Sequence, residues 1–441
     1  MNKNSSIHSL IYLMIIGMLT KVISMSSRVI MSRDLGLNAV SINSLVNPLF
    51  VFGITIASFS LPTTIATLIS KNPQKAKKVF FSSMLITLAF NILIIGLIMI
   101  FGKYIANNLL HNSDTYPSLR LLTIVIPLTS ISSIIKGYFI GKKEVKLTST
   151  SSLVEECSRL LSCIFLVNIF LSQDDSIKST FFIVCMIIGE IVQTSYLILT
   201  SGKKYISKIK KIKGILNIEN YEFSEVLKLS FPMTLSRLLT SFTYMLEPII
   251  ITSLLLKYGH TSEEITLNYG IISSYVMPLL LLPGFFSLAI SNYLLPNLSS
   301  YIGKSQIDKG KHLFNQALII TSIIGIIISI LFFFFGGNLL KIIYHVNFGD
   351  REIRLLAFPF FIYYLETPVN MTMHALSLSK QAFASSFCAS LIRVILLIIF
   401  AEPFGVFAVC IATLCSCYLD VISNLYLIRK FFKGHNKKSI D

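Results

Sequence analysis

Apolar runs of about 20 residues or more recur along nearly the whole chain, and they restrict what it can fold into. A helix needs roughly 20 apolar residues to cross a hydrocarbon core of about 30 Å. We distinguish twelve such runs, with limits at 7–30, 38–70, 77–102, 117–141, 148–172, 179–201, 225–252, 266–299, 312–336, 353–378, 382–401 and 404–428. The pattern predicts an all-α fold, a polytopic membrane protein with twelve transmembrane helices and little room for a soluble domain.

The charge of the chain has to be read along its length. Charged residues make up only 13% of the chain, against about a quarter in soluble domains, yet the net charge is +17. If the N-terminus is cytoplasmic, twenty-three Lys and Arg fall on cytoplasmic segments and six on outer loops. Because basic loops resist translocation, this bias predicts that both termini are cytoplasmic. It also explains the basic composition without a nucleic-acid partner.

The abundance of Ile, Lys, Asn and Ser is typical of a bacterium with an AT-rich genome. We therefore expect a multi-pass protein of the bacterial cytoplasmic membrane, in contact with membrane lipids and acting as a monomer.

The two halves of the chain look like copies of one design. A shift of 234 positions places five residues on identical ones without a gap: Pro62 on Pro296, Gly102 on Gly336, His111 on His345, Arg120 on Arg354 and Arg159 on Arg393. Six spans per copy give both copies the same orientation, so we expect two six-helix lobes related by a pseudo-twofold axis along the membrane normal, with a cleft between them. The predicted divisions are an N-terminal six-helix lobe at 1–201, a basic cytoplasmic linker at 202–224, a C-terminal six-helix lobe at 225–430 and a basic cytoplasmic tail at 431–441.

The second span of each copy is longer than a bilayer requires and contains proline. Residues 38–70 include Pro48 and Pro62, and residues 266–299 include Pro278, Pro283 and Pro296. Proline removes a backbone donor and bends a helix. Bent helices at matching places suit a transporter that rocks about its cleft, although proline is also common in membrane helices generally.

Charged residues within the spans each need a partner or a watery cavity, since one at mid-membrane costs roughly 2.5 to 3.5 kcal/mol. Glu155 and Arg159 are one helical turn apart and can neutralise each other. A gate or a contact between lobes is the functional alternative for this pair. Arg393 has no acid on its own turn, so we expect a partner on another helix, with Glu366 and Asp420 as candidates.

Three cations lack a nearby acid in sequence. Lys21 and Arg28 are two turns apart on the first span, and Arg237 lies in the first span of the second copy. Facing a cleft, they would attract an anion such as a phosphate or pyrophosphate, and we predict that they bind the substrate. Pairing with Glu190, Glu366 or Asp420 across helices is the alternative.

A coupling ion is a further hypothesis. Glu247 precedes Pro248, whose ring interrupts the helical hydrogen bonds, so its carboxylate lies near loosened carbonyl groups. This suits a proton or sodium site, although Glu247 could equally pair with Arg28. With Asp420, Glu155, Arg159 and Arg393, it completes the candidates for coupling or gating. Neither catalytic nor metal-ligand spacing is found, so we expect no enzyme activity, metal or organic cofactor.

The stretch "GYFIGKKEVKLTSTSSLVEECSRLL" at 137–161 resembles the signature of the polysaccharide-exporter family that includes stage V sporulation protein B and, more distantly, MurJ-type lipid II flippases. Eight positions match the signature and five depart from it. The matches are Gly137, Tyr138, Phe139, Gly141, Thr148, Ser151, Glu155 and Arg159, and the departures are Val145, Leu147, Ser149, Ser152 and Glu156. Residues 269–299 and the "ISMSSRVIMSRDLG" segment resemble the eighth and first helices of the family.

This resemblance implies an alternating-access flippase that carries a polyprenyl-pyrophosphate-linked oligosaccharide for cell wall, spore cortex or surface polysaccharide. It also implies that cations of the first helix, here Lys21 and Arg28, line the cavity. Many relatives have fourteen helices, of which the last two form a groove for the lipid tail. The twelve helices expected here leave lipid II in doubt as the cargo. Three alternatives remain: a multidrug exporter of cations with the same fold, a membrane-embedded glycan enzyme, and a non-transporting assembly factor.

Overall fold

The computed structural model describes residues 3–201 and 220–437, and every regular element within those ranges is helical. The chain divides into two compact units, Met1–Met245 and Leu246–Asp441. The division falls inside one long helix, α9 (Asn220–Lys257). The predicted linker at 202–224 lies mostly outside the described residues, as does the end of the predicted tail at 431–441. The predicted lobe boundaries therefore stay predictions.

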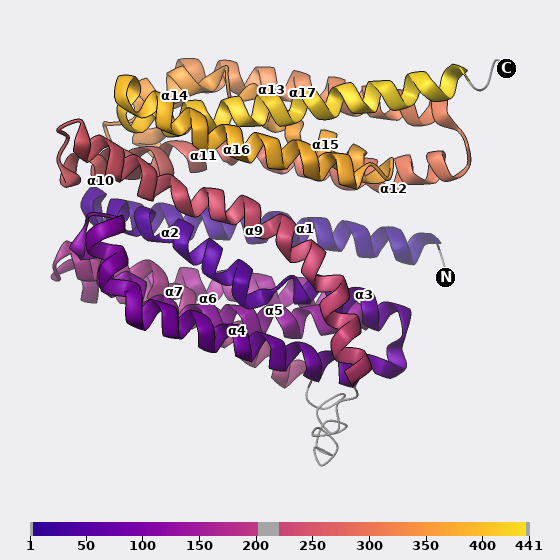
Figure 1. The fold of residues 1–441 in the computed structure, drawn as a ribbon, viewed down its shortest axis with the longest axis horizontal. Coiled ribbons are helices and arrows are strands. Elements are labelled where there is room, and N and C mark those ends of the chain that lie inside the picture. The colour runs from indigo at the N-terminus through magenta and orange to yellow at the C-terminus, as the bar shows by residue number, and fades with distance from the viewer. Residues whose placement is uncertain (1–2, 202–219, 438–441) are drawn as a thin grey trace, which may run out of the picture. The chain divides into compact units, whose positions relative to one another are not determined.

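The first unit is a bundle in which long helices pack along their lengths (Figure 1). Its helices are α1 (Lys3–Asp34), α2 (Gly36–Ser58), α3 (Leu61–Lys71), α4 (Ala76–Tyr104), α5 (Tyr116–Gly141), α6 (Val145–Leu171), α7 (Asp175–Ser201) and the first part of α9. Helix α6 packs on both α1 and α7, while α5 packs on α3, α4 and α7. The arrangement brings α1, α2, α5, α6 and α7 around one pocket.

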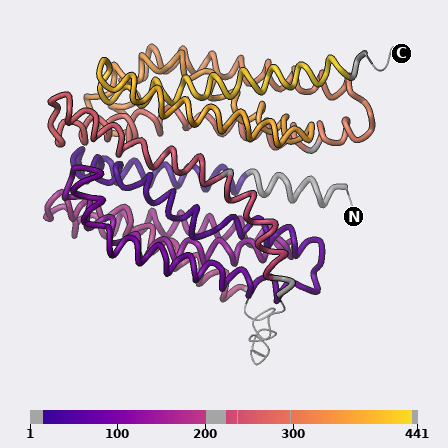
Figure 2. The backbone as a smooth tube through the Cα atoms, viewed as in Figure 1, coloured from indigo at the N-terminus to yellow at the C-terminus, as the bar shows by residue number. Residues whose placement is uncertain are grey.

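The second unit begins with the remainder of α9 and is also a helical bundle, which the tube in Figure 2 traces to the C-terminal helix. Its helices are α10 (Ser262–Gly270), α11 (Met277–Leu281), α12 (Gly284–Gly303), α13 (Ile307–Tyr344), α14 (Asp350–Ala357), α15 (Phe361–Ala375), α16 (Ser379–Phe404) and α17 (Ala408–Lys437). Helices α16 and α17 pack as a hairpin, and α15 packs on both α12 and α17.

Both units have apolar surfaces and partly polar interiors, the reverse of a soluble protein. Ile92 of α4 and Leu199 of α7 are 72% and 77% exposed, whereas Asn91 of α4 is 3% exposed. The buried Asn91 amide donates a hydrogen bond to the Ser130 hydroxyl at 2.9 Å. Hydrogen bonds between helices and apolar outward faces are what a bilayer environment requires. The chain is a multi-pass membrane protein.

The predicted number of twelve spans is not confirmed. Within the described ranges, eight helical stretches are long and apolar enough to cross a membrane, or nine if the bent pair Ser262–Leu281 and Gly284–Gly303 is one span. Each predicted run nevertheless lies on a helix or on consecutive helices. One of the eight, Ser379–Gly434, covers two predicted spans with 56 residues, far more than the roughly 20 that one crossing needs.

The two over-long spans are both broken, as their prolines predict. The first stops at Phe59 and Ser60, which have φ of 45° and 50°, and α3 then restarts with Pro62 in its first turn. The second passes through a π-helical turn, Ile271–Val276, and bends by 48° between α11 and α12, next to Pro283.

The sequence repeat has a counterpart in the backbone. His111 and His345, which are 234 positions apart, have left-handed φ values of 50° and 57°, a conformation that side chains with a Cβ rarely adopt. His345 ends α13, and His111 follows the π-helical end of α4. The same turn therefore recurs at equivalent places in the two units.

Two glycines of the "GYFIG" motif allow α5 to lie directly against α3. A Cβ on Gly137 would be 2.5 Å from the carbonyl oxygen of Pro62, and one on Gly141 would be 2.7 Å from Cβ of Ile69. Such approaches are possible only without a side chain, as in the small-xxx-small packing of membrane helices. The motif is therefore a packing device of the first unit.

We expect Gly137→Ala to lower the thermal stability of the purified protein, because the backbone of α3 must move away. Overpacking of this kind costs roughly 1 to 3 kcal/mol. Gly96→Ala is the matched control, since Gly96 on α4 has open space around it and alanine favours helix. Melting curves in detergent would contradict the packing role if both variants melted like the wild type.

Candidate functional site

A pocket in the first unit combines polar groups with space for a small ligand. Its volume is about 110 Å³, and α1, α2, α5, α6 and α7 contribute its walls. The lining residues are Ser24, Ser27, Arg28, Met31, Asn43, Val46, Asn47, Phe50, Leu122, Val125, Arg159, Phe182, Ile183 and Met186. The space could hold a phosphate-sized group or a few water molecules.

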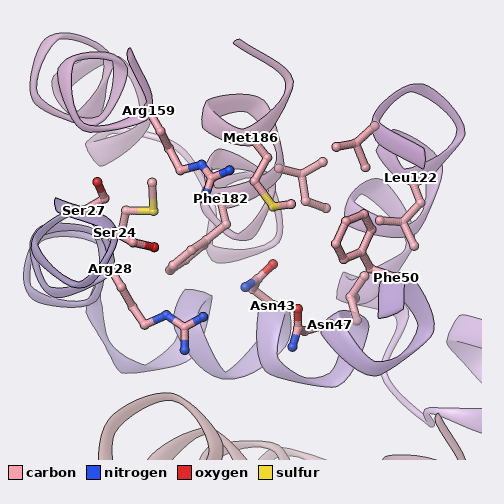
Figure 3. A pocket seen from close by; sticks show the side chains of 14 residues that line it. Ser24, Ser27, Arg28, Asn43, Asn47, Phe50, Leu122, Arg159, Phe182 and Met186 are labelled. Carbon is pink, nitrogen blue, oxygen red and sulfur yellow. The ribbon is translucent and has the colours of Figure 1, made fainter. Parts of the chain in front are cut away.

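The polar part of the pocket carries donors and positive charge. Figure 3 shows the guanidinium groups of Arg28 and Arg159, which come from α1 and α6, with the amides of Asn43 and Asn47 on one face of α2. Asn43 and Asn47 are four residues apart, one helical turn, so both side chains reach the same space. Guanidinium and amide groups together suit an oxyanion or the hydroxyl groups of a sugar.

Arg159 is held by the two carboxylates that the sequence places beside it. Its Nη2 donates to Glu155 Oε1 at 2.7 Å, and its Nη1 donates to both oxygens of Glu156 at 3.1 and 3.2 Å. The predicted Glu155–Arg159 pair is therefore present. Its role as a gate stays a prediction.

Further groups fix Glu155 from the other side. Gln193 of α7 donates to Glu155 Oε2 at 2.5 Å, and Lys136 of α5 lies 3.5 Å from the same oxygen. Nearby, the buried Glu190 carboxylate accepts a hydrogen bond from the Ser132 hydroxyl at 2.5 Å. These contacts join α5, α6 and α7 behind the pocket.

The three predicted substrate-binding cations do not share one place. Arg28 lines the pocket, whereas Lys21 lies two turns earlier on α1 and is not part of its wall. Arg237 lies on α9 and is not part of the pocket wall. All three side chains are exposed, and among the described residues no carboxylate lies within 4 Å of their nitrogens. Their binding role stays a prediction.

In the second unit, the expected partner of Arg393 is wrong. Its Nη2 pairs with Glu247 Oε2, not with Glu366 or Asp420, and the other oxygen of Glu247 accepts from the Tyr269 hydroxyl at 3.2 Å. Helix α9 places Glu247 opposite α16. Glu247 and Arg393 are 146 positions apart in the sequence, so no local pattern predicts that they pair.

Asp420 lies in an uncharged polar cluster. One of its oxygens accepts from Ser386 at 3.1 Å and from Asn424 at 3.3 Å, and the other accepts from Asn370 at 3.4 Å. Asn424 also donates to Asn370 Oδ1 at 2.9 Å. A carboxylate among amide and hydroxyl oxygens could hold a sodium ion or a proton. In the part of the chain that the structure describes, no group of three or more His, Cys, Asp or Glu side chains is arranged for a metal.

We expect Arg393→Met to destabilise the second unit strongly, because it leaves Glu247 buried without its cation. Breaking such a pair costs roughly 3 to 5 kcal/mol. The double variant Glu247→Gln/Arg393→Met should recover much of the loss. Thermal melts of both variants measure this coupling, and additive losses would show that the two side chains do not stabilise each other.

Comparisons with known proteins agree with this architecture. A sequence profile described as "Polysaccharide biosynthesis protein" matches residues 6–302. Stage V sporulation protein B of Bacillus subtilis (strain 168) is 26% identical over 408 residues, which cover 91% of this chain and 79% of that protein. Sporulation protein YkvU of the same organism is 22% identical over 387 residues, covering 86% of this chain and 84% of that protein.

Solved structures show the same fold. A multidrug resistance MATE family transporter of the MOP superfamily, in its inward-facing conformation, superposes with a TM-score of 0.77 at 13% identity and covers 95% of this chain and 96% of its own. The lipid II flippase MurJ, in an inward closed conformation, gives 0.74 at 16% identity and covers 98% and 91%. The chain therefore has the fold of MOP-superfamily transporters.

Proposed function

We propose, from the premise that this chain belongs to the polysaccharide biosynthesis protein family, that it is an alternating-access flippase for a polyprenyl-pyrophosphate-linked oligosaccharide. The cargo would cross the bacterial cytoplasmic membrane to supply cell wall, spore cortex or surface polysaccharide. The chain would act as a monomer with both termini in the cytoplasm.

The position of Arg28 is the main support for this proposal. Arg28 is a cation in a membrane-embedded pocket, and the described residues place no carboxylate within 4 Å of it. A charge in such a place is costly, so a pocket that keeps one is suited to a ligand that brings the opposite charge. A pyrophosphate supplies that charge, and neutralisation lowers the cost of carrying the head group across.

The remaining groups fit the part of the cargo at the pyrophosphate. Asn43 and Asn47 offer amides to its oxygens or to a nearby hydroxyl group, whereas the rest of the oligosaccharide is too large for a space of about 110 Å³ and would lie outside the pocket. The apolar exterior of the helices would let a prenyl tail stay in the lipid while the head moves. Lys21 and Arg237 would guide the anionic head, as exposed cations without a carboxylate within 4 Å in the described ranges.

A multidrug exporter of cations shares this fold and is the second candidate. A cationic drug requires acidic groups facing the cavity. Pocket residues in the first unit include two arginines and no acid, which favours an anionic cargo.

We expect Arg28→Ala to slow translocation of a fluorescent polyprenyl-pyrophosphate-linked disaccharide in proteoliposomes by roughly tenfold or more. Loss of a charge-assisted contact to phosphate has about this effect. Lys21→Ala should slow it less. Arg120→Ala, which removes an exposed arginine of α5 outside the pocket, is the control and should match the wild type. Undiminished transport by both Lys21→Ala and Arg28→Ala would rule the proposal out.

Coupling to sodium or protons belongs to the same proposal, with Asp420 as the binding group and Glu247 as the alternative. We expect Asp420→Asn to make transport insensitive to an imposed sodium or proton gradient, since the amide cannot carry the charge. The same gradient should still accelerate Glu402→Gln, whose exposed side chain lies far along α16 from the Asp420 cluster. A gradient effect that survives Asp420→Asn would exclude Asp420 from coupling.

A further inference from the structure

The two carboxylates on Arg159 are not held in the same way. Glu155 has partners behind the pocket, Gln193 at 2.5 Å and Lys136 at 3.5 Å, in addition to Arg159. Neither Gln193 nor Lys136 lines the pocket. Glu155 is therefore fixed from three sides, and its contacts would survive if a ligand took over part of Arg159.

Glu156 is held through the pocket wall itself. It accepts two hydrogen bonds from the single Nη1 of Arg159, at 3.1 and 3.2 Å. Arg159 lines the pocket. An oxyanion that entered the pocket would therefore meet the same donor that now holds Glu156.

The pocket also has donors to spare. The Nε–H of Arg159 is buried and has no acceptor among the described residues. Across the pocket, Arg28 has no carboxylate within 4 Å in the described part of the chain. A buried donor without an acceptor costs free energy, so an anion that reached it would gain a hydrogen bond.

We propose that Glu156 is an internal counter-anion, which a phosphate group of the cargo displaces from Arg159. The phosphate takes Nη1 and reaches Arg28, while Glu156 moves toward Lys21, an exposed cation of α1, the helix that packs on α6. This inference rests on the proposed function and adds a residue that sets the affinity for the head group.

The exchange has a physical advantage over a permanently empty cation site. Before the cargo arrives, Glu156 neutralises Arg159 in a low-dielectric setting where an isolated charge is costly. Afterwards one ion pair has replaced another, so the net affinity stays modest. A flippase has to release its cargo on the far side, and a competing carboxylate makes this release easier.

The test is the affinity of the purified full-length chain for inorganic pyrophosphate, measured by titration calorimetry in detergent. Glu156→Gln keeps the shape of the side chain and removes its charge, so it should bind pyrophosphate about tenfold more tightly than the wild type, equivalent to about 1.4 kcal/mol. Glu263→Gln, at an exposed glutamate of α10, is the control for a change of one unit of net charge and should match the wild type.

A merely structural Glu156 would give the opposite result, because loss of its bonds would loosen the pocket and weaken binding. Equal or weaker binding by Glu156→Gln overturns the inference, as does absence of binding by both proteins at millimolar pyrophosphate. If Glu156→Gln does not fold, Glu156→Asp serves instead. Its carboxylate is one methylene shorter and retreats from Arg159, so affinity should rise by a smaller factor, and unchanged affinity overturns the inference.

The proposed function fails separately, in the transport assay. If the wild-type protein moves lipid-linked sugar but Glu156→Gln binds pyrophosphate no more tightly, the flippase function stands and only the role of Glu156 as a counter-anion is refuted. If the wild-type protein does not move the sugar, the proposed flippase function is refuted, whatever the calorimetry shows.

Discussion

The cost of placing a charge in a low-dielectric membrane is the constraint on which the rest of this structure depends. The interior charges are arranged to meet that cost by pairing or by hydrogen bonding. Glu247 pairs with Arg393, Glu155 joins Lys136 and Arg159, and Asp420 is surrounded by amide and hydroxyl groups. Arg28 shares with Lys21 and Arg237 the lack of a carboxylate within 4 Å among the described residues, and of these three exposed cations it is the one that lines the pocket. A cation at this place is suited to an anion that enters the pocket.

The fold itself does not choose the cargo. The chain superposes on a multidrug resistance transporter and on a lipid II flippase with TM-scores of 0.77 and 0.74, so the same architecture accommodates different cargoes. The chemistry of the pocket has to make the choice. Here the wall carries Arg28 and Arg159 with two asparagines and no acidic residue, which favours an oxyanion attached to a hydroxylated group.

Much of the fold could be predicted from the sequence, because hydrophobic length and proline position are local signals. The apolar runs located the helices, and Pro62 and Pro283 located the breaks. The Glu155–Arg159 pair was equally local, one turn apart on one helix. What failed depended on distant segments: the partner of Arg393 lies 146 residues away, at Glu247. The contacts of Gln193 with Glu155 and the joint position of Asn43 and Arg159 on one pocket also arise only when separate helices come together. The signals for the pocket in the sequence were Arg28, a cation without a nearby acid, and the asparagine pair at Asn43 and Asn47 within an apolar run.

If an anionic head group neutralises the cations of this pocket, the lipid that carries it should copurify with the protein. Mass spectrometry of lipids extracted from the wild type and from Arg28→Ala, both purified in mild detergent, would identify the occupant. We expect a polyprenyl-pyrophosphate-linked sugar on the wild type and its loss from the variant. Equal amounts of that lipid on both proteins, or a cationic small molecule in its place, would show that Arg28 does not bind an anionic cargo.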